Sequence, residues 1–180
     1  MLTNNVLLDG FARVAELVPA VLDGLGPDDV LWRPDAGANS IGWLIWHLSR
    51  VEDDHLAGLT GADQAWDAEG WAERFALPYP AGAHGYGQSA EEVAAFPVGD
   101  PALLAGYHAA VAARAAAIIS GLTEADYARI VDTRWDPPVT AAVRLVSVLN
   151  DVTQHVGQAG YVRGLRERAA DRGSGWAGIA

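Results

Sequence analysis

The sequence predicts an all-α protein built as a four-helix bundle. Four long segments carry apolar residues at the three- and four-residue spacing of an amphipathic helix. Residues that begin or end helices bound these segments, and no stretch shows the alternating pattern of a strand. Since one long connection separates the second and third helices, we expect an antiparallel type of bundle with a crossover. A single domain is expected over residues 1–172, with a flexible glycine-rich tail over residues 173–180.

The first two helices are defined by periodicity and by the residues at their ends. The first is expected over residues 3–25, until a Gly-Pro pair interrupts the apolar pattern. A turn follows, and Asn39 or Ser40 offers a side-chain oxygen as the N-cap of the second helix. That helix is expected to run to about Leu59.

The last two helices follow the long connection. Asp100 is a suitable N-cap for a third helix over residues 101–122, with proline at its first position. The stretch "TEADY" then predicts a short capped turn. The fourth helix is expected over residues 140–170, directly after "RWDPPVT".

The connection over residues 62–99 is long for a compact domain. It contains three prolines and the glycine-rich run "AGAHGYGQS", with short helical pieces expected at residues 68–75 and 89–96. Long connections of this kind are usually functional or form a lid. Within the run, His84 and Tyr86 are placed to reach a site on the bundle from above.

The composition excludes several classes of function. A formal net charge of −11 repels nucleic acids and anionic membrane surfaces. No stretch approaches roughly 18 consecutive apolar residues, and the N-terminus lacks the pattern of a signal peptide. We therefore expect a cytoplasmic protein that acts on a small molecule.

The absence of two residue types limits the chemistry. The chain has no cysteine, which excludes disulfides, thiolate zinc sites and a cysteine nucleophile of its own. All twelve basic residues are arginine, so Schiff-base chemistry on lysine is excluded as well. Any thiol chemistry must use a thiol supplied by another molecule.

Three side chains on two helices form the candidate site. Asp151 and His155 lie one turn apart at the border of the apolar face of the fourth helix, and His47 lies at the corresponding border of the second. Such a set leaves a fourth coordination position open, as catalytic zinc sites do, and it also suits iron, nickel or manganese. The alternative from spacing alone is a hydrogen-bonded Asp–His pair without metal.

Three stretches carry a resemblance to a known family: "NSIGWLIWHLSRVEDDHLAGL", "HGYGQSAEEVAAF" and "DVTQHVGQAGYVRGL". In order and spacing they resemble the DinB/YfiT-like superfamily of candidate metalloenzymes, especially the actinobacterial branch near mycothiol-dependent maleylpyruvate isomerase. The resemblance covers about residues 4–168. It implies a four-helix bundle that is often a homodimer and holds one divalent metal, and for some members it implies thiol-dependent chemistry.

The resemblance assigns the metal ligands residue by residue. His47 matches the histidine of the family's "HL" pair, His155 matches the last histidine ligand, and Asp151 matches the ligand one turn earlier. The isomerase branch has glutamate at that earlier position, so this chain keeps the carboxylate on a side chain one methylene shorter. Zinc is the expected ion, with iron or nickel as alternatives, and mycothiol is the expected cosubstrate.

Further residues of the same helices are candidates for binding a cosubstrate. Arg163 falls within the apolar face of the fourth helix, where it could bind a carboxylate or pair with Glu52. Gln158 could face the ligand or the solvent. His55 lies two turns beyond His47, roughly 12 Å along the helix axis and too far to share the ion, so it is predicted to be structural.

Three functions remain open at this point. The first is a metal-dependent enzyme, a thiol transferase, isomerase or hydrolase, whose ion activates water or a low-molecular-weight thiol. The second is a non-catalytic protein that binds a small molecule in the bundle. The third is a dimerisation scaffold whose histidines and aspartate are only hydrogen-bonded.

Overall fold

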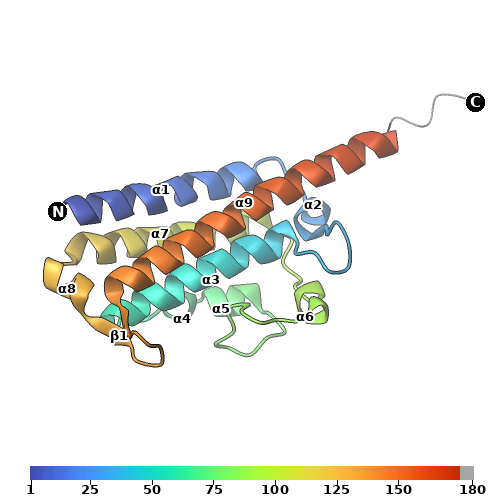
Figure 1. The fold of residues 1–180 in the computed structure, drawn as a ribbon. Coiled ribbons are helices and arrows are strands. Elements are labelled where there is room, and N and C mark those ends of the chain that lie inside the picture. Colours follow the sequence, from blue (N-terminus) through green and yellow to red (C-terminus); the bar gives the residue numbers. More distant parts are fainter. Residues whose placement is uncertain (175–180) are drawn as a thin grey trace, which may run out of the picture.

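Four long helices dominate the part of the chain that the structure, a computed structural model, describes. This part comprises the backbone of residues 1–174 and the side chains of residues 1–170. The helices pack into a bundle in which α3 lies between α7 and α9 and α1 closes the other side (Figure 1). Their bounds are α1 Leu2–Leu22, α3 Ile41–Thr60, α7 Pro101–Gly121 and α9 Ala141–Ser174. The all-α fold class and the bundle are confirmed.

Residues near the ends of these helices behave as their sequence predicts. The side chain of Ser40 accepts a hydrogen bond from the Trp43 backbone N–H at the start of α3, and that of Asp100 accepts one at the start of α7. Gly61 ends α3 in the left-handed conformation, which favours glycine. Of the tail expected from residue 173, the first two residues continue α9, and the rest lie outside the described residues.

The directions of the helices differ from a simple antiparallel bundle. Gly10 packs against Leu149 and Gly160 faces Val21, so α1 and α9 run in the same direction as neighbours. The long connection from α3 to α7 returns along the bundle, so these neighbours also run in the same direction, with Ser49 beside His108 and Gly58 beside Ile118. By contrast, α3 and α9 run antiparallel (Figure 1).

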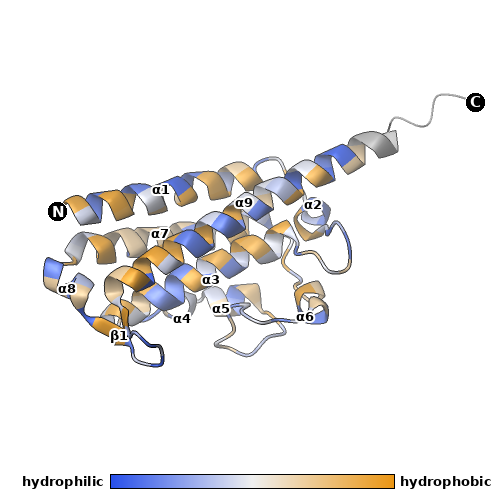
Figure 2. Ribbon diagram, in the orientation of Figure 1, coloured by the Kyte–Doolittle hydropathy of each residue, from blue (hydrophilic) through white to orange (hydrophobic). Residues whose placement is uncertain are grey.

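The core is built from one face of each helix. Hydrophobic and hydrophilic residues alternate along α1 and α9, as expected for helices with one buried side (Figure 2). The helix α7 is apolar enough over its 21 residues to meet the length and composition of a membrane span, but here it packs between α1 and α3. Fully buried residues at the centre include Val18, Leu44, Leu48, Leu104, Val111, Leu145 and Val152.

Short elements fill the connections. The helical piece expected over residues 68–75 is divided in two because Gly70 adopts a φ of +70° between the halves. The "TEADY" turn is a short helix capped by Thr123, as predicted. The short helices are α2 Pro27–Leu31, α4 Ala65–Ala68, α5 Trp71–Phe75, α6 Ala90–Ala94 and α8 Glu124–Ala128.

The expectation that the chain contains no strands is wrong for the segment before α9. Here β1 (Ile130–Asp132) pairs antiparallel with β2 (Val139–Thr140) as a small hairpin. Strands of three and two residues are too short to show an alternating pattern, so the sequence carried no signal for them. The hairpin places the residues between its strands beside α3 and α9.

Candidate metal site

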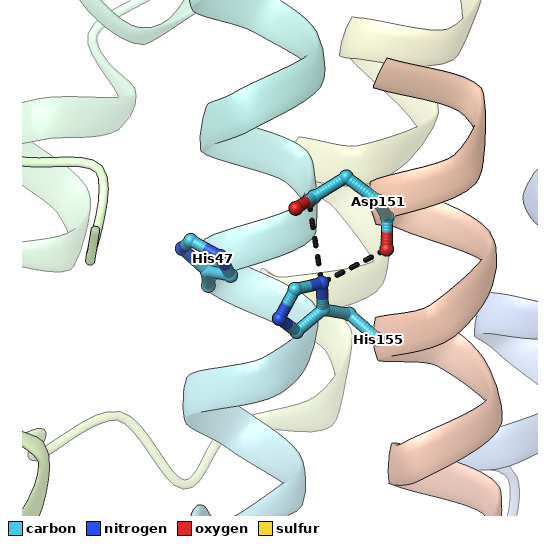
Figure 3. A group of neighbouring side chains, drawn as sticks. All are labelled: His47, Asp151 and His155. Carbon is cyan, nitrogen blue, oxygen red and sulfur yellow. Dashed lines mark hydrogen bonds and ion pairs between the residues drawn. The ribbon is translucent and has the colours of Figure 1, made fainter. Parts of the chain in front are cut away.

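The three predicted ligands meet between α3 and α9. His47 comes from α3, and Asp151 and His155 come from α9 one turn apart (Figure 3). One ligand atom from each residue lies within 4.8 Å of the other two. The centroids of the two imidazole rings are 4.5 Å apart. The antiparallel packing of the two helices therefore brings two nitrogen donors and a carboxylate within reach of a single cation.

His47 is held in a fixed orientation by its neighbours. Its buried ring stacks on Trp43, with the centroids 4.7 Å apart and the planes 14° apart. Its Nδ1 is hydrogen-bonded to the backbone carbonyl of His84 in the connection. A carbonyl only accepts, so Nδ1 carries the proton and Nε2 is the unprotonated donor that can bind a metal.

Gly85 allows the connection to approach His47 this closely. A Cβ at this position would lie 2.6 Å from His47 Nδ1 and 2.9 Å from Trp43 Cζ2. The φ of Gly85 is +94°, in the region that favours glycine. The connection is also tied to α3 by Gln88, whose side-chain oxygen accepts a hydrogen bond of 2.8 Å from Trp43 Nε1.

A buried charged network holds the same connection from the other side. Arg50, buried on α3, donates from Nε to the carbonyl of Ala83, 3.2 Å away, next to the residue that contacts His47. The carboxylate of Asp53 accepts hydrogen bonds from the Tyr107 hydroxyl and from the backbone at the start of α4. Because its members are paired, this network is a support for the site rather than a second site.

Asp151 and His155 contact each other within α9. His155 Nδ1 lies 2.9 Å from the Asp151 backbone carbonyl and 3.2 Å from its side-chain Oδ1 (Figure 3). Oδ1 is buried, and this ion pair with His155 is its one polar contact among the described residues. A single contact at this distance leaves a buried carboxylate oxygen under-satisfied, and a cation shared with the imidazoles would complete its contacts.

The shifted pKa values of His47 and Asp151 favour metal binding, whereas that of His155 opposes it. Burial lowers the pKa of His47 to about 4, so its imidazole is neutral at neutral pH. Burial also acts to lower the pKa of His155, but hydrogen bonding and the charge of Asp151 outweigh it and raise the pKa. Burial opposes ionisation of Asp151, yet contact with His155 leaves its pKa below the usual range. The site thus combines a neutral His47 imidazole with a carboxylate that favours ionisation, and a metal ion would compete with a proton for His155.

Comparison with known proteins assigns the chain to a family. The model of the DinB superfamily matches residues 11–159, a range that includes all three candidate ligands. The chain belongs to the DinB superfamily. The superfamily part of the resemblance seen in the sequence is thereby confirmed. No curated protein matches this DinB-superfamily chain.

A solved structure shares the fold. The crystal structure of a conserved protein from Enterococcus faecalis is 31% identical in sequence, with a TM-score of 0.83. The similarity covers 88% of this chain and 94% of that one. The helical bundle is thus a shared feature of the two proteins.

A pocket opens beside the three ligands in this DinB-superfamily protein. Its volume is about 590 Å³, and it lies between α3, α9, the glycine-rich connection and the hairpin. His47 and Asp151 line one end, and His55, Asp132, Arg134 and Arg144 are among the polar residues that line the remainder. A hollow of about 640 Å³ near the C-terminal ends of α3 and α7 contains none of the three ligands.

Arg163 does not take the position expected for it. Its NH1 donates to the carbonyls of Ala20 and Val21 at 2.9 and 3.0 Å, and its Nε pairs with Glu167 at 2.8 Å. The expected pairing with Glu52 is therefore wrong. The side chain lies at the border of α9 over the end of α1, where the last carbonyls of a helix need donors.

The other candidates lie nearer to the site. Gln158, one turn beyond His155, is exposed and remains a candidate for contact with a bound molecule. His84 and Tyr86 line the pocket, as the position of the connection predicted. His55, predicted to be structural, also lines this pocket.

The sequence interpretation missed the arginine wall of the pocket. Arg134 lies between strands that were not predicted. Arg144, however, precedes Asp151 by seven residues, so the two share one side of α9. The seven-residue spacing is therefore the sequence signal that places this arginine on the same side of the helix as the candidate ligand Asp151.

Proposed function

We propose that this protein is a metal-dependent enzyme in which His47, Asp151 and His155 hold one divalent ion, zinc first and iron or nickel as alternatives. The observation that carries the proposal is the meeting of three donors within 4.8 Å, one of them a carboxylate whose buried Oδ1 contacts only His155 among the described residues. When bound, the ion supplies a Lewis acid that lowers the pKa of water or of a thiol.

The chain's own residues prepare the site for this chemistry. Trp43 and the His84 carbonyl orient His47, so its Nε2 is presented without rotational freedom. Asp151 orients His155 in the same way through Nδ1. The connection excludes water from the buried side of His47, while the pocket provides space for an electrophilic substrate.

The thiol is proposed to come from a small cosubstrate of the mycothiol type. The chain has no cysteine, so a thiol nucleophile has to be supplied by another molecule. The resemblance to the actinobacterial branch near mycothiol-dependent maleylpyruvate isomerase supports the same cosubstrate. Transfer of the thiol to an electrophile, or isomerisation through its addition and loss, is the reaction class that follows.

Metal analysis tests this proposal. The purified protein, after reconstitution with Zn²⁺, is expected to hold one ion per chain. His47→Ala and Asp151→Ala should each weaken binding by more than the roughly 10–100-fold that loss of an outer-shell partner costs. As a control, His108→Asn removes a buried imidazole outside the three ligands and should leave the stoichiometry unchanged.

Two results would redirect the interpretation. Failure of the reconstituted protein to retain any divalent ion would overturn the proposed metal site. Binding of the ion without turnover in panels of thiols and electrophiles would favour a small-molecule-binding protein instead of an enzyme.

A further inference from the structure

Two guanidinium groups share one carboxylate in the pocket wall. Asp132 Oδ2 lies 3.0 Å from Arg144 NH2 and 2.8 Å from Arg134 NH2. Asp132 Oδ1 also accepts a hydrogen bond of 3.0 Å from Arg134 Nε. The cluster therefore carries one more positive charge than negative charge.

Arg144 keeps hydrogen-bond capacity for a ligand. A guanidinium has five N–H groups, and the contacts of Arg144 are NH2 with Asp132 and NH1 with His55 Nδ1 at 3.3 Å. Burial, with the nearby Arg144 charge, lowers the pKa of His55, so this imidazole can accept from the arginine. The side chain of Arg144 is 20% exposed and lines the pocket. Its remaining N–H groups can thus reach a molecule in the pocket.

The pocket is elongated between this cluster and the metal ligands. Arg144 and Asp151 are separated by seven residues of α9, which is roughly 10 Å along the axis. Val51 from α3 and Val148 from α9 line the space between the two ends. The arginine end is locally positive, unlike the general field of a protein with a net charge of −11.

From this arrangement we infer the substrate class: an elongated monocarboxylate. Its reactive end lies at His47 and Asp151, its apolar middle packs against Val51 and Val148, and its carboxylate binds Arg144 and Arg134. Forked guanidinium donors match a carboxylate in geometry, and the single excess charge matches a monoanion better than a dianionic phosphate. This inference rests on the proposed function for the reactive end, whereas the carboxylate end can be tested separately.

The first test uses probes that span the pocket. Calorimetric titration of the Zn²⁺-loaded protein compares ω-mercaptocarboxylates of three to ten carbons with mercapto-alcohols of the same lengths. Carboxylates should bind about tenfold more tightly than the alcohols at the lengths that reach Arg144, and equally at three carbons. Phosphonates of the same lengths should bind more weakly than the carboxylates.

Variants identify the residue responsible. Arg144→Met keeps the length of the side chain and should abolish the carboxylate preference while three-carbon thiols bind as before. Arg13→Met, which removes an exposed arginine on α1, is the matched control and should change nothing. The comparison between carboxylates and alcohols in the wild-type protein needs no variant, so it decides the question even if Arg144→Met folds poorly.

The metal-free protein separates the two proposals. Octanoate should bind to it more tightly than octanol, and this difference should depend on Arg144. If thiols fail to bind the Zn²⁺-loaded protein but octanoate binds through Arg144, the proposed function is wrong and the carboxylate site stands. If carboxylates never exceed alcohols at any length, or phosphonates exceed carboxylates, the inference is overturned.

Discussion

Gly85 offers the sharpest test of how the connection positions the candidate ligand His47. In Gly85→Ala, the new Cβ would lie 2.6 Å from His47 Nδ1 and 2.9 Å from Trp43 Cζ2, closer than real Cβ contacts. The φ of +94° adds a backbone cost of about 1–2 kcal/mol for alanine. Relief of the overlap requires the connection to move away, which separates the His84 carbonyl from the His47 ring.

The expected result is a loss of metal affinity. Loss of an outer-shell hydrogen bond to a ligand histidine typically weakens metal binding by about 10–100-fold, and we expect Gly85→Ala to fall in this range. Competition of the protein with a chromophoric chelator for Zn²⁺ measures the effect. Circular dichroism at each step establishes that the helices are retained.

A second glycine of the glycine-rich connection distinguishes the effect of the overlap with His47 from the cost of a positive φ. Gly87 has a φ of +74°, yet a Cβ there would have no atom within 4 Å. Gly87→Ala therefore carries a similar backbone cost without touching His47, and its affinity for Zn²⁺ should stay close to that of the wild type. Equal affinities of the two variants would refute the claim that the connection positions His47.

Two predictions concern stability. Burial raises the pKa of Glu52 from 4.5 to about 8, so the unfolded chain ionises first and stability falls as the pH rises between these values. At pH 7 the loss is about 3 kcal/mol, since each pH unit above the ordinary pKa contributes about 1.4 kcal/mol. In urea unfolding, Glu52→Gln should remove this pH dependence, whereas Glu16→Gln, at an exposed position, should retain it. If the free energy of unfolding of Glu52→Gln followed the same course with pH as that of the wild type, Glu52 would not be its cause. In Gly42→Ala the Cβ would lie 2.9 Å from the Val98 carbonyl oxygen, so we expect a loss of about 1–3 kcal/mol in urea unfolding. Gly58→Ala on the same helix has open space and should gain up to about 1 kcal/mol, so a similar change in both would count against the packing argument.

Local signals account for what the sequence predicted correctly. Ser40 and Asp100 cap helices because their side-chain oxygens reach backbone N–H groups within three residues. The spacing of Asp151 and His155 places them on one side of α9 regardless of the rest of the fold. These relations depend only on the geometry of a single helix, so they can be derived before any packing is known.

What the amino-acid sequence determined by itself is therefore the four long helices, their ends to within a few residues, and the border on which each candidate ligand lies. Tertiary structure decided which borders meet: it brought His47 to His155, sent Arg163 to the end of α1 instead of to Glu52, and placed Arg144 in the pocket. Periodicity gives the direction of a side chain around the axis of its own helix. Contact across the bundle also depends on the order, direction and register of the packed helices, and a long connection does not specify these.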